Sequence, residues 1–287
     1  MTKYSIVIPA YNEEESIKNV LGDIRSVMNR TKKSYEIIVV NDASTDNTEN
    51  IVSKSKEIKI ITHERNQGYG ASLKDGIRKA RGEWIIITDS DGTYFIKDIT
   101  KLLKHTNGHD MIIGARKSKN VPLLRRPAKW ILKRVSNYIT NTRIPDLNSG
   151  LRVFRKDLAY RFWNLFPDGF SFTTTITIAA LCSGYEVKYI NINYLKRKGK
   201  SSIHPTDFIG FIKILSKIAL YFRPLKIFFP VSVIIFLLGV LRGIRDFIVT
   251  NSLGELSVIL VMVSIQILFF GFLAELVIQK LENKVVI

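Results

Sequence analysis

The sequence predicts an α/β fold with a mainly parallel sheet, followed by a helical segment that associates with a membrane. Short β-branched runs alternate with helical stretches in the N-terminal part of the chain. Such continuous apolar strands, interleaved with helices, are typical of a sheet that is covered on both faces. The last quarter of the 287-residue chain is far more apolar than the rest, which indicates a membrane part.

Five strands, several of them separated by helical stretches, follow from these runs. The strands are expected at Tyr4–Ile8, Tyr35–Val40, Ile58–Thr62, Trp84–Thr88 and Met111–Gly114, and the helices at Glu14–Met28 and Ala71–Ala80. Open parallel sheets bind ligands at the carboxyl ends of their strands. The stretches "PAYNEE", "NDASTD" and "DSDGT" follow three of the strands, so the sequence predicts a polar site at this edge.

The charge balance predicts anionic partners. The net charge is +18 and the isoelectric point is near 9.9, values that suit nucleic acid, phosphorylated ligands or an acidic lipid surface. Between Lys196 and Lys226 there are eight Lys or Arg residues against one Asp. Because this excess lies beside the apolar spans, it favours a bilayer over nucleic acid.

An amphipathic segment is predicted over residues 204–226. Its apolar residues recur at helical spacing, whereas Lys213 and Lys217 lie on the opposite face; the apolar positions are Phe208, Phe211, Ile212, Leu215, Ala219 and Phe222. This pattern indicates a helix that lies on a membrane surface. The alternative is an ordinary surface helix of the soluble domain.

A two-helix transmembrane hairpin is predicted over residues 227–287, ending in a short cytosolic tail. Ile227–Leu241 and Leu256–Ala274 are uncharged, and the first is short for a span unless its flanking cations reach outward. The connecting loop is expected at Arg242–Glu255. No cleavable secretion signal is expected at the N-terminus, and the basic flank predicts that residues 1–203 lie in the cytosol. We therefore expect a multi-pass protein of the cell membrane.

Asp89 and Asp91 stand one residue apart directly after the fourth strand. Two such carboxylates can bind one hard cation, since Mg²⁺ or Mn²⁺ often takes one or two carboxylates plus substrate phosphates. An Asx turn that caps a helix starting near Ile96 explains the pair equally well.

Asp42 ends the second predicted strand and is interpreted as a ligand for a base N–H or a ribose hydroxyl. Asp46 and Glu49 are interpreted as a helix capping pair. The stretch "QGYGASLKDG" does not match the GxGxxG fingerprint, because Leu73 occupies its third glycine position.

These residues resemble glycosyltransferase family 2, and within it the synthases that attach sugars to dolichyl or undecaprenyl phosphate. The resemblance covers the whole chain. It rests on "SIVIPAYNEEESI", "EIIVVNDASTDNT", the stretch leading to "DSDGT", the D-x-x-S-G-x-R pattern in "DLNSGLRVFRK", and "RKGKSS".

The resemblance implies a GT-A fold and a set of site residues. The nucleotide would contact Pro9, Tyr11, Glu13, Asp42 and Asp89, and Mg²⁺ or Mn²⁺ would bind Asp89 and Asp91. Asp91, Arg116 and Arg152 would form the catalytic set. The acceptor and its phosphate would contact Arg126, Arg134, Asp146, Ser149, Arg197, Lys200 and Ser201.

The chain departs from the family pattern at two places. Thr93 stands where relatives commonly have Gln, which bears on metal binding. The helix "RRPAKWILKRVSNYIT" has no clear Arg-x-x-x-Ser pair, so Arg126, Lys129 and Arg134 are its substitutes for the usual phosphate contacts. A solvated or lipid-facing helix side explains this basic cluster equally well.

A missing residue pattern also bears on the acceptor. Sugar hydroxyls need a general base, yet the chain contains no Glu-Asp dipeptide of the kind that supplies one in many relatives. A lipid monophosphate needs none, because its second pKa is about 6. Arg116, Arg152, Arg197 and Lys200 are suited to hold two anionic substrates, and membrane-surface attraction is a second role for Arg197 and Lys200.

The sequence thus predicts an inverting transferase that moves one sugar from a UDP- or GDP-sugar to a polyprenyl phosphate. The lipid bilayer is an expected partner and nucleic acid is not. Oligomeric state is left open, self-association of the membrane anchor included. The rival interpretations are a processive synthase, a transferase with another lipid or glycan acceptor, and a non-catalytic membrane module that binds nucleotide sugars.

Overall fold

The computed structural model describes residues 2–116, 126–169, 171–195 and 216–285. The chain divides into two compact units, Met1–Ile212 and Lys213–Ile287. The predicted interfacial segment, 204–226, straddles this division. Its residues 204–215 lie outside the described part of the chain, and residues 216–222 are helical. Ala219 and Phe222 are buried there and Lys217 is exposed, in line with the predicted pattern.

The first unit is built on a seven-stranded sheet with the order β3-β2-β1-β4-β6-β5-β7. Only β6 runs antiparallel to its neighbours, β4 and β5. The strands are β1 (Tyr4–Ala10), β2 (Tyr35–Asn41), β3 (Ile58–Thr62), β4 (Trp84–Ile87), β5 (Met111–Arg116), β6 (Arg152–Arg155) and β7 (Val187–Ile192). The five predicted strands are confirmed to within two residues at each end. The strands β6 and β7 are additional.

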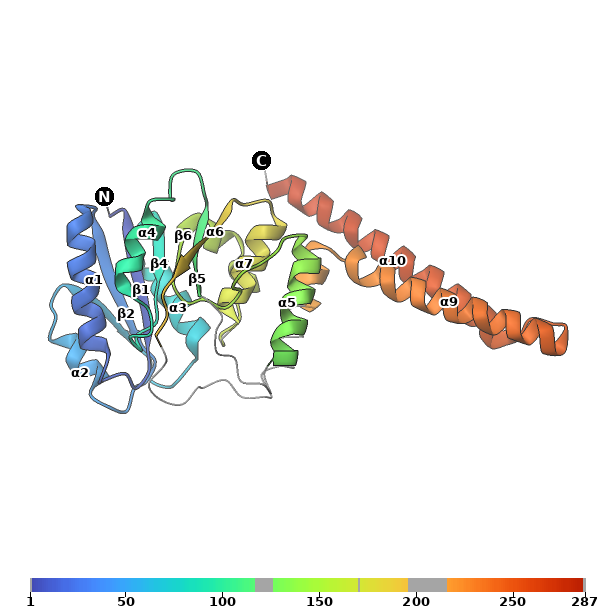
Figure 1. Ribbon diagram of the computed structural model, residues 1–287, viewed down its shortest axis with the longest axis horizontal. Coiled ribbons are helices and arrows are strands. Elements are labelled where there is room, and N and C mark those ends of the chain that lie inside the picture. The colour runs from blue at the N-terminus through green and yellow to red at the C-terminus, as the bar shows by residue number, and fades with distance from the viewer. Residues whose placement is uncertain (1, 117–125, 170, 196–215, 286–287) are drawn as a thin grey trace. The chain divides into compact units, whose positions relative to one another are not determined.

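Every residue of β1 is buried, and successive side chains of a strand point to opposite faces of the sheet. Both faces are therefore covered, and helices lie on each of them (Figure 1). The face with Ile6 and Ile8 packs against the apolar side of α1 (Ile17–Thr31). Val7 and Val40, on the other face, meet α3 (Tyr69–Lys79) at Gly76, where an added Cβ would lie 2.3 Å from Val7 Cγ1. Figure 1 shows the sheet between these helices.

The first unit has further helical elements among its described residues. They are α2 (Thr48–Ser53), η1 (Ile96–Asp98), α4 (Ile99–Leu103), α5 (Arg126–Thr140), α6 (Lys156–Arg161), η3 (Trp163–Leu165) and α7 (Phe172–Cys182). The start of α2 corrects the predicted capping pair. Asp46 accepts a hydrogen bond from the Thr48 N–H, at 2.9 Å, but the cap position is Asn47. Glu49 does not reach back to Asp46; it bonds Asn41 and Thr62 instead.

The second unit is a helical hairpin of α9 (Leu225–Thr250) and α10 (Glu255–Val285). Both helices are long and apolar enough to cross a membrane, with mean hydropathies of 2.4 and 2.6 in their most apolar windows. Gly239 lets the two helices approach, since an added Cβ would lie 3.0 Å from Leu260 and Val261.

The predicted hairpin loop, Arg242–Glu255, is wrong. The helix α9 continues through Arg242 and Asp246, which form an ion pair one turn apart at 3.1 Å, and only residues 251–254 connect the helices. The prediction ended the span at the first charged residue. Opposite charges one turn apart can pair along one face of a helix, so they do not have to end it. At 26 residues and about 1.5 Å per residue, α9 is no longer short for a membrane span.

Candidate active site

The predicted motifs gather at one edge of the sheet. The parallel strands β2, β1 and β4 are neighbours, so Tyr11, Asp42 and Asp89 follow three adjacent strand ends. The antiparallel β6 begins where these strands end, because Arg152 is paired with Ile87 of β4. The D-x-x-S-G-x-R signature therefore reaches the same edge from the opposite chain direction.

The loops after β1 and β2 are tied together. The Asn12 N–H donates to Ser44 Oγ at 3.0 Å, and the Thr45 N–H donates to Asn12 Oδ1 at 2.7 Å. The Glu13 N–H donates to Thr48 Oγ1 at 2.8 Å. These bonds leave the Tyr11 side chain 48% exposed, so Tyr11 is open to a ligand. The two loops are thus joined by hydrogen bonds, and together they are called the floor of the site.

Pro9 and Glu13 occupy different environments in this floor. Pro9 is buried, and its carbonyl accepts a hydrogen bond from Ser90 Oγ at 2.9 Å. Glu13 is partly exposed, and its carboxylate accepts a bond from Ser16 Oγ at 3.0 Å. The Ser16 hydroxyl also lies 2.7 Å from the Ser90 carbonyl. Pro9 thus anchors the loop that carries Asp89 and Asp91, whereas Glu13 has its carboxylate near solvent.

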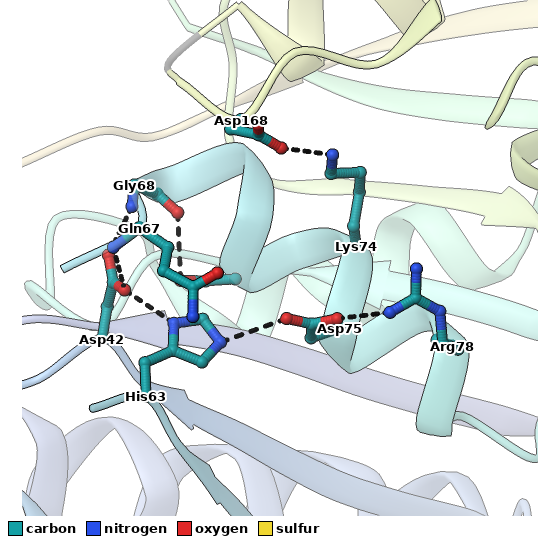
Figure 2. A network of polar contacts seen from close by, with 9 residues as sticks. Asp42, His63, Gln67, Gly68, Lys74, Asp75, Arg78 and Asp168 are labelled. Atoms are coloured by element: carbon teal, nitrogen blue, oxygen red, sulfur yellow. Dashed lines mark hydrogen bonds and ion pairs between the residues drawn. The ribbon is translucent and has the colours of Figure 1, made fainter. Parts of the chain in front are cut away.

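Asp42 is buried and holds a neighbouring loop. Its Oδ1 accepts a bond from the Gln67 N–H at 2.8 Å, and its Oδ2 accepts one from the Gly68 N–H at 2.8 Å. The imidazole of His63 lies 2.7 Å from Oδ1. Figure 2 shows this network. Sequence reasoning assigned Asp42 a ligand role and missed that it organises the segment before α3.

Tyr69 connects this segment to the paired aspartates. Its hydroxyl donates to Asp89 Oδ1 at 3.0 Å. Burial, followed by the charge of Asp89, raises the pKa of Tyr69 well above its ordinary value, so the phenol stays protonated and can donate. Because Tyr69 directly follows Gly68, one three-residue segment contacts both Asp42 and Asp89.

Gly150 packs against Asp89 from the other side. An added Cβ at Gly150 would lie 2.6 Å from Asp89 Oδ1 and 2.7 Å from Oδ2. The Gly150 N–H donates to the Tyr94 hydroxyl at 2.6 Å, which keeps the backbone in this place. The glycine of the signature is therefore required for the close approach of backbone and carboxylate.

Asp91 forms an Asx turn, which the sequence offered as the alternative explanation to a metal site. Its Oδ1 accepts bonds from the Thr93 N–H at 3.0 Å and the Thr93 hydroxyl at 2.6 Å, around Gly92 with φ of +69°. The turn caps no helix, because η1 begins after Phe95. Thr93 thus orients Asp91.

The donor set at this loop fits a hard cation. Asp89 and Asp91 supply carboxylate oxygens, and Mg²⁺ binds one or two carboxylates while taking its other ligands from phosphates and water. Among the described residues, no group of three His, Cys, Asp or Glu side chains could hold a metal by itself. A cation here would consequently depend on substrate phosphates for part of its shell.

Arg116 and Asp146, predicted on the phosphate and acceptor sides, form one ion pair. The Arg116 Nε lies 2.7 Å from Asp146 Oδ2, and Nη2 lies 3.0 Å from Oδ1. Burial pushes the pKa of Asp146 upward, but the hydrogen bonds and charge of Arg116 outweigh it and hold this pKa below its ordinary value. The Arg116 guanidinium also lies over the Tyr194 ring.

Arg152 is fully buried, so in this structure it lines no open acceptor face. Its Nε donates to the Ser149 carbonyl at 3.1 Å, and its Nη1 donates to the Thr173 carbonyl and Thr177 Oγ1, both at 2.9 Å. Burial lowers the pKa of Arg152. Ser149 is buried as well. The geometry makes Arg152 a residue that positions the Ser149–Gly150 backbone beside Asp89.

The remaining predicted acceptor residues are only partly described. Arg134 on α5 is exposed, and its guanidinium lies 5.2 Å from the centroid of the Trp130 ring. The side chains of Arg126 and Lys129 lie outside the described part of the structure, as do Arg197, Lys200 and Ser201.

Four site residues escaped the sequence analysis: His63, Tyr69, Tyr94 and Gly150. His63 directly follows the predicted strand Ile58–Thr62, so the same rule that found Asp42 could have found it. Gly150 is the glycine of the D-x-x-S-G-x-R pattern, which was its signal. Tyr69 and Tyr94 carry no such signal, because their roles depend on contacts with residues distant in the sequence.

Two protein families match successive parts of the chain. Residues 5–163, more than half of the chain, match Glycosyl transferase family 2, and residues 223–279 match the GtrB C-terminal hairpin. The second match coincides with the two apolar helices. It supports the membrane association of this unit.

Two curated relatives are dolichyl-phosphate enzymes by name. The Haloferax volcanii dolichyl-phosphate hexose transferase is 27% identical over 71% of this chain and 90% of its own length. The Trichomonas vaginalis dolichyl-phosphate beta-glucosyltransferase ALG5C is 28% identical over 76% of this chain and 71% of its own.

Solved structures share the fold. Mannosyl-3-phosphoglycerate synthase from Rubrobacter xylanophilus has a TM-score of 0.60 at 15% identity, over 76% of this chain and 72% of that one. Glucosyl-3-phosphoglycerate synthase from Mycobacterium tuberculosis, solved with Mn²⁺ and UDP-glucose, has a TM-score of 0.55 at 16% identity, over 76% and 77%. With the predicted GT-A fold and the family match in agreement, this chain belongs to glycosyltransferase family 2.

Proposed function

We propose that the enzyme transfers one sugar from a nucleotide sugar to a polyprenyl phosphate at the cytosolic face of a membrane. One observation carries the proposal: a family 2 domain with a carboxylate-lined sheet edge is followed in the same chain by a hairpin long enough to span a bilayer. The names of the two dolichyl-phosphate relatives support the acceptor class.

The donor half of the reaction is assigned to the ends of β1, β2 and β4. Tyr11 offers an exposed ring to the nucleotide, and Asp42 lies at the back of the same floor as a hydrogen-bond acceptor. Asp89 and Asp91 would hold Mg²⁺ or Mn²⁺, which when bound would stabilise charge on the departing nucleoside diphosphate. Tyr69 and Thr93 keep the two carboxylates oriented toward that position.

The acceptor half is assigned to the start of β6 and the end of β5. An oxygen of the lipid phosphate forms a bond to the anomeric carbon, the bond from that carbon to the nucleoside diphosphate breaks, and the electron pair leaves with the diphosphate. No base is needed, because the phosphate oxygen is ionised at neutral pH. Arg116 supplies positive charge beside this path while Asp146 holds its guanidinium in place.

The membrane orientation is assigned from charge. The flank before α9 carries eight Lys or Arg against one Asp between Lys196 and Lys226, whereas Arg242, Arg245, Asp246 and Glu255 cancel near the other end of the hairpin. The positive-inside rule then places the catalytic unit and the C-terminus in the cytosol. This orientation brings the site to the leaflet where the acceptor headgroup lies.

A panel assay tests the proposal. Purified full-length protein is incubated with Mg²⁺ or Mn²⁺, UDP- and GDP-sugars and a short polyprenyl phosphate, beside Asp91→Asn and an EDTA control. We expect metal-dependent glycolipid formation that falls at least about 100-fold in Asp91→Asn, because the lost carboxylate removes charge stabilisation from the transition state.

The matched control is Asp23→Asn, which removes a carboxylate from the exposed side of α1 and should keep full activity. If nucleotide sugars bind but none is consumed by the wild-type protein, the transferase assignment fails and a non-catalytic binding module replaces it. If sugar reaches another acceptor instead, the polyprenyl phosphate assignment fails alone.

A further inference from the structure

The geometry points to His63 as a positioning residue for the nucleotide donor, acting through Asp42. His63 was absent from the predicted site. The inference rests on the proposed function, because it takes Asp42 as the carboxylate at the back of the nucleotide floor. It assigns the imidazole a role in orienting the Asp42 carboxylate, in addition to filling space in the protein interior.

His63 sits where three elements meet. It directly follows β3, and its backbone N–H donates to the Asn41 carbonyl of β2 at 2.9 Å. Its side chain is buried between Asp42, after β2, and Asp75, on α3. Nδ1 lies 2.7 Å from Asp42 Oδ1, and Nε2 lies 3.2 Å from Asp75 Oδ2 (Figure 2).

The contacts of the ring are directional. Each ring nitrogen faces one carboxylate, Nδ1 that of Asp42 and Nε2 that of Asp75, so the two contacts fix the plane of the imidazole. Asp75 is itself held by Arg78, whose Nη1 lies 2.7 Å from Asp75 Oδ1. A row of polar contacts thus runs from the exposed Arg78 through Asp75 and His63 to the buried Asp42.

This chain of contacts sets the direction of the Asp42 carboxylate. Oδ1 is shared between His63 and the Gln67 N–H, and Oδ2 binds the Gly68 N–H. A carboxylate buried with fewer donors is costly, so loss of the imidazole favours rotation of Asp42 or movement of the loop.

The loop has little freedom to follow such a rotation. Gly68 has φ of +99°, and an added Cβ there would lie 2.8 Å from the Asp168 carbonyl. The Ala71 N–H donates to the same carbonyl at 2.9 Å, and Lys74 forms an ion pair with the Asp168 carboxylate. Because the loop is docked on one side, the imidazole on the other side determines how well Asp42 faces the nucleotide.

Two substitutions separate the contacts of the ring. His63→Asn keeps an amide N–H near the place of Nδ1, toward Asp42, whereas His63→Gln places one near Nε2, toward Asp75. His63→Ala removes both. The matched control is His105→Ala, which removes an imidazole from the segment after α4, outside this network.

The experiment measures donor KM and kcat for each full-length variant with the donor found active in the panel assay, and the Kd for UDP and GDP by calorimetry. Circular dichroism and thermal unfolding show whether each variant is folded. We expect donor KM and nucleotide Kd to rise about 10-fold in His63→Ala and His63→Gln. His63→Asn and His105→Ala should stay within about threefold of the wild type, and kcat should change less than KM.

Two results would overturn the inference. One is a donor KM and nucleotide Kd in folded His63→Gln and His63→Ala equal to those of the wild type. The other is a fall in kcat alone with KM unchanged. A wild-type protein that transfers no sugar would instead refute the proposed function, and the nucleotide Kd values of the variants would still decide the role of His63.

Discussion

The two halves of the sheet edge are built differently. The donor half, at the ends of β2, β1 and β4, comes from parallel strands whose polar motifs directly follow buried apolar runs. The acceptor half surrounds the start of the antiparallel β6, so its signature precedes a strand. The donor half uses carboxylates held by backbone N–H groups, whereas the acceptor half uses arginines held by protein oxygens.

Under the proposed function, this difference suits an edge that handles two anionic substrates. Carboxylates on the donor side suit a cation and hydrogen-bond donors of a nucleotide, and Arg116 on the acceptor side suits a second phosphate. The halves touch at Asp89, which receives the Tyr69 hydroxyl from one side and the Gly150 backbone from the other. Substitutions at that junction and beside it test how independent the halves are.

The largest effect is expected from Asp146→Asn in the acceptor half. The substitution leaves the Arg116 guanidinium, only 24% exposed, without its ionic partner. Breaking a buried pair in this way costs about 3 kcal/mol of unfolding free energy. Denaturant unfolding of the full-length protein in detergent measures it. The control is Asp157→Asn, whose partner Arg155 is exposed, with an expected loss under about 1 kcal/mol.

The difference in unfolding free energy between Asp146→Asn and the wild type is expected to depend on pH. The pKa of Asp146 is lowered from its ordinary 3.8, so the ionised carboxylate stabilises the folded state above that value. In the wild type this contribution is lost as the pH falls through the lower, folded-state pKa. Asp146→Asn lacks the contribution at every pH, so the stability gap between the two proteins should narrow below about pH 4. A constant gap from pH 7 to pH 3 would contradict this account.

A smaller effect is expected from Gly150→Ala, which tests whether the halves must touch. The new methyl group meets the Asp89 carboxylate at 2.6 Å and displaces it. Overpacking of this kind costs about 1–3 kcal/mol of unfolding free energy. Displacement of Asp89 should separately lower the metal-dependent rate by about tenfold, which corresponds to about 1.4 kcal/mol of transition-state stabilisation. Gly169→Ala is the control, because its Cβ would meet no atom within 4 Å. Equal activity of the two variants would show that the halves are independent.

The smallest effect is expected from Tyr69→Phe in the donor half. The variant loses one hydrogen bond to Asp89 while the ring stays in place. A bond to a charged group is worth about 1.5–3 kcal/mol, and rearrangement of the carboxylate recovers part of it, so we expect about a tenfold weaker Mn²⁺ activation. Activity titrated with Mn²⁺ measures this shift. Tyr160→Phe, at a residue 44% exposed, is the control, and equal Mn²⁺ dependence of the two variants would contradict a role for the Tyr69 hydroxyl.

The parallel half of the fold was predictable from sequence because its signals are local. Strand runs such as Trp84–Ile87 are wholly buried and apolar, and the motifs stand directly behind them. The strand β6 was missed because it has only four residues and begins and ends with arginine. The hairpin loop was misplaced for a related reason, since Arg242 and Asp246 neutralise each other inside α9.

The sequence alone thus determined the family, the parallel strands, the motif residues and the apolar hairpin, because a short run of residue types is enough to identify each of them. The tertiary structure decided which of those residues are buried and which other residues they contact. Arg152 became a buried support, Asp42 the centre of a network with His63, and Gly150 the neighbour of Asp89. These roles depend on burial and on contacts between distant residues, which sheet pairing creates and composition does not record.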